Sequence, residues 1–250
     1  MKTQKAVLSL FAIALLELSA TRLSAQSFVA TYDFNLVTTS SGTTDPTPPP
    51  TATGVTFGAF TSTGASANPN AGARFSFTSQ PTGGVNGVDD FSQFTGSLSP
   101  TAYFEVTITP LTLIELQLDT IAFTVQRSGT GIRSYAVRSS VDGFNANLAA
   151  SINPANANLG VGPGDELRVL LDSVSTAQNG SLITLGLPHA SLTTAVTFRF
   201  YGWNAEAGTG TFSVDNVQFS GSTRNIPEPS VAAILALGLG AWTVRRKVNA

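Results

Sequence analysis

Hydrophobic and polar residues alternate with a period of two through most of the chain between residues 26 and 224. Gly, Pro, Asn and Asp interrupt this alternation at short intervals, and almost no stretch has the 3.6-residue period of an amphipathic helix. The clearest case is the run in which Val196, Phe198 and Phe200 alternate with Thr197 and Arg199. The pattern predicts ten strands: Phe28–Phe34, Val55–Phe60, Ala73–Thr78, Ala102–Thr109, Leu113–Gln126, Ile132–Val141, Leu167–Ser173, Ser181–Leu185, Ala195–Trp203 and Thr211–Ser220.

Ten short strands separated by turns, without alternating helices, indicate an all-β domain. We expect an antiparallel β-sandwich of the jelly-roll type over residues 26–224. Two predicted strands change face midway, because the alternation slips by one residue near Asp119-Thr120 and again near Asp215-Asn216, as at a β-bulge. Residues 38–54 (Thr38 to Gly54) are too rich in proline and polar residues for a strand, and they are predicted to form an exposed, mobile loop.

The first 25 residues have the pattern of a secretory signal peptide. Lys2 and Lys5 give a positive start, residues 6–16 are apolar, and Ser24–Ala25 offers a cleavage point. The apolar run is too short to span a bilayer. This segment, residues 1–25, is therefore predicted to be a signal helix that is removed on export. The alternative is a short buried helix.

Residues 225–250 contain a second processing pattern. Pro227, Glu228 and Pro229 precede an apolar run from Val231 to Val244, which Ser230 can cap as a short transmembrane helix. A basic cluster follows the run: Arg245, Arg246 and Lys247. Positive charges favour the cytoplasmic side of a membrane, so the domain would lie on the outer side. The alternative is a plain anchor behind a rigid proline linker.

The order of Pro-Glu-Pro, apolar helix and basic cluster resembles the PEP-CTERM sorting signal of Gram-negative bacteria that produce exopolysaccharide. The resemblance implies that an exosortase, a membrane transpeptidase-like enzyme, recognises Pro227, Glu228 and Pro229 and removes the helix. The chain would be the substrate of that reaction. It would be held briefly in the inner membrane and then pass to the cell envelope or the extracellular space.

Parts of the domain also resemble other proteins that carry this sorting signal. These parts are Tyr32–Phe34, Arg138–Phe144, Phe198–Trp203 and Gly210–Val217. The resemblance implies a sandwich domain of unassigned function, so it bears on the fold rather than on an activity.

Charge and composition exclude some classes of partner. Between residues 26 and 226 there are seven arginines, no lysine and thirteen acidic residues, which leaves a net charge of −6. A domain with this balance lacks a cationic surface for phosphates, so nucleic acid is not an expected partner. The chain has no cysteine, which excludes a disulfide framework and cysteine-based metal sites.

Groups for catalysis are few. A serine hydrolase would need the single histidine, His189, as its base, with Ser181 or Ser191 as nucleophile, but no G-x-S-x-G elbow is present. We interpret His189 as a surface residue. Glycoside hydrolysis needs two facing carboxyl groups. The sequence singles out no pair among its candidates, which are Glu105, Glu115, Asp119, Glu166 and Glu206. The chain is therefore predicted not to be an enzyme.

Calcium is the ion that the sequence favours. Asp33 lies on the first predicted strand, and Asp215 and Asn216 lie on the last. The terminal strands of a jelly roll often pair, and such pairing would bring together the hard oxygen ligands that Ca²⁺ prefers. The alternative is that these residues bond to their own backbone at a turn and a bulge.

Three residues of one strand suggest a carbohydrate site. Tyr201 and Trp203 alternate away from Phe198 and Phe200, so they are placed on the outer face of a sheet, with Arg199 beside them. Exposed aromatic rings can stack on sugars, and arginine can donate hydrogen bonds to them. The alternative is that these rings are packed under other segments.

Together these features predict an exported, non-catalytic surface or extracellular-matrix protein that is processed at a C-terminal Pro-Glu-Pro signal. The alternative function is a glycan-binding module that acts in exopolysaccharide. No cofactor is expected apart from a structural calcium ion.

Overall fold

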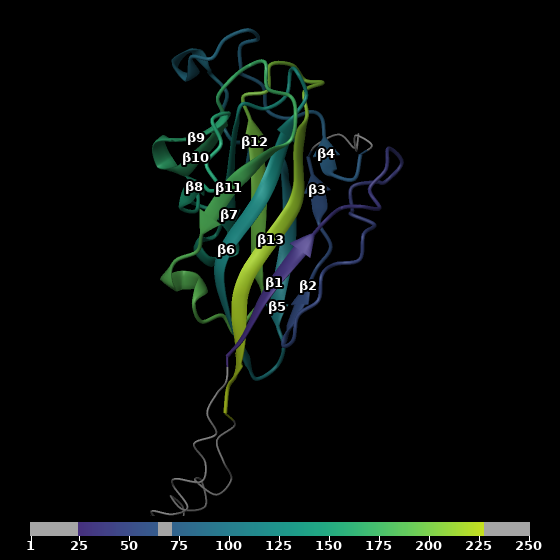
Figure 1. Ribbon diagram of the computed structural model, residues 1–250, viewed down its shortest axis with the longest axis vertical. Helices are drawn as coiled ribbons and strands as arrows, with labels where there is room; N and C mark the ends of the chain where they lie inside the picture. Colours follow the sequence, from purple (N-terminus) through teal and green to yellow (C-terminus); the bar gives the residue numbers. More distant parts are fainter. Residues whose placement is uncertain (1–24, 65–71, 228–250) are drawn as a thin grey trace, which may run out of the picture. The chain divides into compact units, whose positions relative to one another are not determined.

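Two antiparallel sheets stack face to face in the computed structural model, which describes residues 25–64 and 72–227 (Figure 1). The six-stranded sheet has the order β1 (Gln26–Tyr32), β13 (Phe212–Asn225), β6 (Ile114–Arg127), β11 (Gln178–Thr184) and β8 (Ala150–Ile152), with β4 (Phe75–Phe77) also beside β13. The seven-stranded sheet has the order β2 (Val55–Phe57), β5 (Tyr103–Pro110), β12 (Val196–Trp203), β7 (Ser134–Ser139), β10 (Glu166–Val169) and β9 (Leu159–Gly162), with β3 (Thr61–Thr63) also beside β5. Four short 3-10 turns complete the described elements: η1 (Phe91–Gln93), η2 (Ser140–Asp142), η3 (Pro163–Asp165) and η4 (Leu187–His189).

The strand order is that of a jelly roll. Eight of these strands, taken in chain order, are β1, β5, β6, β7, β10, β11, β12 and β13. If these eight are numbered 1 to 8, strands 1, 8, 3 and 6 lie side by side in one sheet (β1, β13, β6, β11). Strands 2, 7, 4 and 5 lie side by side in the other (β5, β12, β7, β10). The chain thus crosses repeatedly between the sheets, as in two joined Greek keys. The β-sandwich prediction is confirmed.

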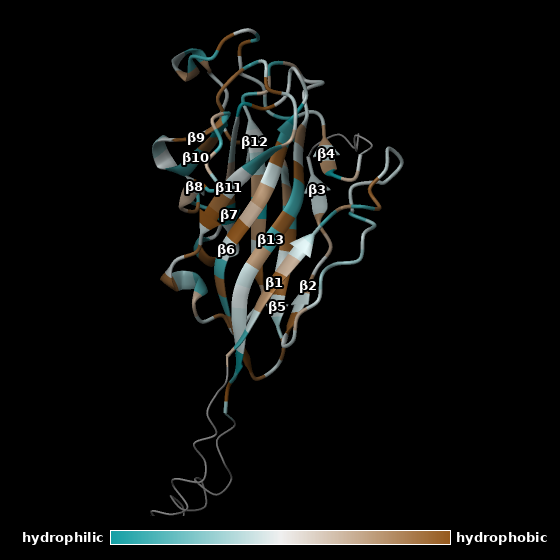
Figure 2. Ribbon diagram, in the orientation of Figure 1, coloured by the Kyte–Doolittle hydropathy of each residue, from teal (hydrophilic) through white to brown (hydrophobic). Residues whose placement is uncertain are grey.

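The core lies between the sheets because each strand turns alternate residues inward. On β5, Phe104, Val106 and Ile108 are buried while Tyr103, Glu105 and Thr107 are only partly covered. Figure 2 shows the same banding of hydrophobic and hydrophilic residues along β6 and β13. Phenylalanine rings from both sheets interlock at the centre, and burial of such rings is the main favourable term in folding.

All ten predicted strands have a counterpart, and three short strands were missed. The missed strands, β3, β8 and β9, have three or four residues each, too few for an alternation to be recognised. Several predicted ends are also too long. The prediction of Ile132–Val141, for example, includes Ser140 and Val141, which form η2.

Both predicted changes of face occur. On β6 the buried residues are Leu116 and Leu118 before the slip, and then Ile121 and Phe123 after it. On β13 the buried positions change parity between Val214 and Val217. Asn216 has a left-handed backbone (φ 49°), a conformation that asparagine tolerates better than most residues. These slips let each long strand face the core along its whole length.

The loop between β1 and β2 is a correction to the sequence prediction. The middle of the segment 38–54 is not exposed, because Asp45 and Thr47 are buried. The backbone amide of Asp45 donates to the carbonyl of Phe60 (2.9 Å), and the Thr47 hydroxyl accepts from the amide of Leu36 (3.1 Å). The segment is therefore tied to the edge of the sandwich, which its proline-rich composition does not reveal.

The terminal strands of the sandwich pair with each other. Gln26 on β1 lies opposite Thr223 on β13, and residues 26–223 form one compact unit. Figure 1 shows the segment of residues 79–102 at the far end of this unit, away from Gln26 and Thr223. The predicted signal helix and C-terminal helix, including Glu228, Pro229 and the basic cluster, lie outside the described residues. Within the described ranges, no helix is long and apolar enough to cross a membrane.

Candidate functional site

The predicted carbohydrate residues lie on the outer face of the seven-stranded sheet, but two of them are covered. Tyr201 is 2% exposed and Trp203 is 6% exposed. They form a small second core with Ala136, against which Leu98 and Tyr103 pack. The prediction that these rings are free for sugars is wrong, because a segment remote in sequence, which contains Leu98, packs on the outer face.

Arg199 remains partly accessible on the same face. Its Nε donates to Oε2 of Glu105 (3.0 Å), the residue opposite it on β5. Its guanidinium carbon lies 4.0 Å from the ring centres of both Tyr103 and Phe144, so the cation is stacked between two aromatic side chains. Stacking of this kind fixes the guanidinium plane and leaves its edge for further hydrogen bonds.

The three predicted calcium residues lie near one another, as the pairing of β1 with β13 requires. Their side chains follow the alternative interpretation, however. Asp33 accepts hydrogen bonds from the backbone and side chain of Asn35, and Asp215 accepts from the backbone and side chain of Asn216. Among the residues that the structure describes, no three acidic or histidine side chains are grouped to hold a metal ion. Calcium stays a prediction without a formed ligand set.

His189 is buried and not on the surface, which corrects the sequence interpretation. Its Nε2 lies 3.0 Å from the Ser139 hydroxyl, and its ring stacks on Phe198. Burial lowers the pKa of the imidazole. No hydrogen bond forms at Nδ1 within the described parts of the chain, so no carboxylate orients this ring as in a hydrolase triad. The serine is itself 1% exposed.

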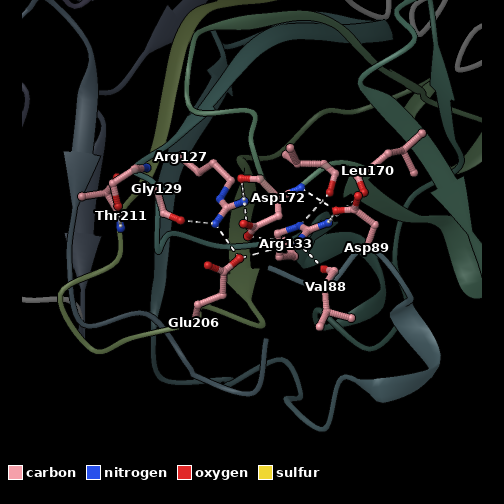
Figure 3. A network of polar contacts seen from close by, with 11 residues as sticks. Val88, Asp89, Arg127, Gly129, Arg133, Leu170, Asp172, Glu206 and Thr211 are labelled. Carbon is pink, nitrogen blue, oxygen red and sulfur yellow. Dashed lines mark hydrogen bonds and ion pairs between the residues drawn. The ribbon is translucent and has the colours of Figure 1, made fainter. Parts of the chain in front are cut away.

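The most unusual site is a buried network of ion pairs at the far end of the sandwich (Figure 3). Its centre is formed by Arg127, the last residue of β6, and Arg133, just before β7; their side chains are 1% and 0% exposed. Both occupy core-facing positions, since Arg127 continues the parity of Phe123 and Val125. A buried cation must be paired and hydrogen-bonded to be tolerated.

Arg127 binds the carboxylate of Glu206 and a backbone carbonyl in each of two loops. Its Nη2 donates to Oε1 of Glu206 (2.6 Å) and to the carbonyl of Gly129 (2.7 Å), and its Nη1 donates to the carbonyl of Asp172 (3.0 Å). The Glu206 side chain is fully buried. This pair therefore joins the end of β6 to the turns after β10 and β12.

Arg133 uses all three guanidinium nitrogens. It donates to the carbonyls of Val169 (3.0 Å), Val88 (2.8 Å) and Leu170 (2.7 Å), and to Oδ1 of Asp89 (3.2 Å). Its Nη1 also lies 3.5 Å from Oδ1 of Asp172 and 3.6 Å from Oε1 of Glu206. The network thus connects four separate segments of the chain through two arginines.

Two carboxyl groups of the network are close enough to share a proton. Within the described residues, Oε2 of Glu206 and Oδ1 of Asp172 are buried and accept no hydrogen bond, although Oδ1 of Asp172 lies 3.5 and 3.7 Å from nitrogens of Arg133 and Arg127. Burial, together with a hydrogen bond to Asp172, raises the pKa of Glu206 to about 7. Burial alone would raise the pKa of Asp172, but hydrogen bonds from Glu206 and the Gly87 amide, with the two arginines, lower it. One proton between the two groups satisfies both oxygens.

This carboxyl pair differs from the pair used in glycoside hydrolysis. There the two groups face each other across about 5–10 Å of space for a sugar and water. Here they are in contact, and both are bound by Arg127 and Arg133. The arrangement is suited to holding loops together.

Comparison with known proteins gives no match to a protein-family model and none to a curated protein. Among solved structures, the chain is similar to the K3 cleaved adhesin domain of Lys-gingipain from Porphyromonas gingivalis W83, with 16% identity over 78% of this chain and 99% of that domain, at a TM-score of 0.34. The K2 cleaved adhesin domain of Lys-gingipain gives 14% identity over 77% and 97% of the two chains, at a TM-score of 0.33. Values this low leave the function to be argued from the residues of this chain.

Proposed function

We propose that this chain is an exported, non-catalytic surface or extracellular-matrix protein, processed at its C-terminal Pro-Glu-Pro signal by an exosortase-type enzyme. The observation that carries the proposal is where the folded unit begins and ends. It starts at Gln26, directly after the predicted signal peptide, and ends at Thr223, shortly before Pro227. The whole jelly roll therefore lies between the two segments that export and sorting would remove.

The sorting step depends on the chemistry of the C-terminal segment. Pro227 and Pro229 restrict the backbone to an extended form on either side of Glu228, which suits recognition by an enzyme cleft. The apolar run after them partitions into the inner membrane, and Arg245, Arg246 and Lys247 hold its end on the cytoplasmic side. After cleavage the jelly roll is free to enter the cell envelope or the extracellular matrix.

Replacing Glu228 with alanine is expected to block C-terminal processing in the native host. The recognition segment loses its only charge, so the chain keeps its apolar segment and stays in the membrane fraction. Mass spectrometry of the mature protein measures this directly. The control is Asp119→Ala, which removes an exposed carboxylate from the jelly roll and should be cleaved at the same C-terminal position as the wild type. An E228A protein that is cleaved at the wild-type C-terminal position and found at the wild-type location would contradict the proposal.

A second function, glycan binding, is favoured by one observation: the partly exposed stack of Arg199 between Tyr103 and Phe144. We infer that a hydroxyl-rich polysaccharide of the host would contact this stack, and not Trp203, which is covered. Rings and guanidinium edges together suit the apolar faces and hydroxyl groups of sugars.

Arg199→Ala is expected to weaken binding of the secreted protein to the host exopolysaccharide by about tenfold, or ~1.4 kcal/mol. Affinity electrophoresis in gels that contain the polysaccharide gives the comparison. Arg168→Ala is the matched control, because Arg168 is equally exposed (24%) and also pairs with a glutamate, Glu166. Equal retardation of the two variants, or no binding by the wild type, would contradict glycan binding at the Arg199 stack.

A further inference from the structure

The loop of residues 85–94 is attached to the sandwich almost entirely by charged groups. No residue of this 85–94 loop is buried. Its carbonyl at Val88 and carboxylate at Asp89 are held by Arg133, and Oδ1 of Asp89 also accepts from the backbone amide of Asp172 (2.6 Å). By contrast, the residues before the loop, among them Gly83 and Gly84, pair through their backbones with Ala205, and the amide of Thr95 after the loop donates to the carbonyl of Gly83 (3.0 Å). The loop can therefore move while its two ends stay fixed.

The aromatic side chains of the 85–94 loop also depend on these charges. The rings of Phe91 and Phe94 lie 5.4 and 5.3 Å from the guanidinium of Arg133, and Phe91 lies 4.4 Å from that of Arg168. Neither ring is inserted into the core. The two rings are therefore held by cation–π contacts and not by burial in the core. If Arg133 moves, the loop loses these contacts.

The charge of the network is balanced only when it holds one proton. Five ionisable groups face one another: Arg127 from β6, Arg133 from the start of β7, Asp89 from the loop, Asp172 after β10 and Glu206 after β12. Two cations and three carboxylates leave a charge of −1. A proton shared by Glu206 and Asp172 removes that excess and supplies a donor for two buried oxygens that accept no hydrogen bond from the described residues.

We propose that the proton shared by Glu206 and Asp172 keeps the 85–94 loop docked, and that its loss to solvent releases the loop. Without the proton, the Glu206 and Asp172 carboxylates both carry a negative charge and repel each other. Asp172 is the member that can move, because its side chain is 23% exposed and Glu206 is fully buried. Movement of the Asp172 side chain withdraws its carboxylate from the amide of Gly87, which lies in the loop, and from Arg133, which binds Val88 and Asp89.

The direction of the pH effect follows from the pKa of Glu206. Its folded-state value, about 7, lies above that of an unfolded glutamate. The proton therefore contributes stability at acidic pH, and this contribution is lost as the pH rises through about 7. The loop is docked in mildly acidic medium and loosened in mildly alkaline medium, where Phe91 and Phe94 lose their cation–π partner. This device is independent of sorting and of glycan binding.

Hydrogen exchange of the full-length purified protein at pH 6.0 and 8.5 tests the device. After correction for intrinsic exchange rates, the protection factors of wild-type amides in the 85–94 loop are expected to be about fivefold lower at pH 8.5 than at pH 6.0. The protection factors of amides in β5 and β12 should not change. Glu206→Gln keeps the hydrogen bond without ionising, so its loop should stay protected at both values. Glu105→Gln, which removes a partly exposed carboxylate of another ion pair, should behave as the wild type.

Equal loop protection in the wild type at the two pH values would overturn the proposal, as would a Glu206→Gln variant that loosens like the wild type. Carbon-13 NMR of the glutamate carboxyl groups in the wild-type protein gives a test that needs no variant. One glutamate signal is expected to titrate near pH 7 and to be perturbed in Asp172→Asn. If all glutamates titrate between about pH 4 and 5, the proposal of a proton shared near neutral pH is wrong.

Discussion

Arg133→Ala is expected to lower the free energy of unfolding by about 3–5 kcal/mol, the cost of breaking a buried ion pair by removing one partner. The substitution leaves the carbonyls of Val169, Val88 and Leu170 without their donor. It also leaves the carboxylates of Asp172 and Glu206 with a single cation. Equilibrium urea denaturation at pH 6.0, followed by tryptophan fluorescence, measures the loss.

Arg138→Ala provides the comparison for this prediction. Arg138 is partly exposed, has no ion pair within the described residues, and donates only to Asn147 and the carbonyl of Phe144. Its loss is expected to cost about 1 kcal/mol, as for an ordinary hydrogen-bonded surface residue. A cost for Arg133→Ala that is no larger would mean that the network does not hold the far end of the sandwich.

Much of the fold can be predicted from local pattern because the sandwich is built on alternation. Val196, Phe198 and Phe200 are buried on β12, as their period-two spacing predicts. The shift of parity on β13 identifies the slip beside Asn216 without any tertiary information. The burial of the loop 38–54 could not be predicted in this way. Asp45 is buried where the loop bonds to Phe60 and β3, and the composition of the loop does not specify that contact.

The candidate sites were only partly predictable, and the reason is long-range packing. The face of Tyr201 was placed correctly, but its covering by Leu98 depends on a segment far away in the sequence. For the ion network a signal was present: Arg127, at the end of β6, and Arg133, just before β7, are both buried, and a buried arginine needs buried partners. Those partners, Glu206 and Asp172, come from other loops, so the sequence indicates the need for them without naming them.

Phe104→Ala is expected to destabilise the protein by about 3–5 kcal/mol, as large-to-small changes of buried aromatic residues do. Phe104 belongs to the seven-stranded sheet, yet its ring stacks on Phe212 (4.9 Å between ring centres) and contacts Phe75 and Phe77 (5.2 and 5.3 Å) in the six-stranded sheet. Truncation therefore opens a cavity between the sheets, which three neighbouring rings on fixed strands cannot close. The midpoint of thermal unfolding should fall accordingly.

The matched change at an exposed site separates cavity formation from general loss of apolar surface. Leu187 is 89% exposed, so Leu187→Ala should alter the free energy of unfolding by less than about 0.5 kcal/mol. The loss of unfolding free energy in Phe104→Ala should also differ from that in Arg133→Ala in its pH dependence. Phe104 packs on the rings of Phe75, Phe77 and Phe212, which do not ionise, so the cost of its truncation should be the same at pH 6.0 and 8.5. Equal stability of Phe104→Ala and wild type would mean that this ring does not join the two sheets.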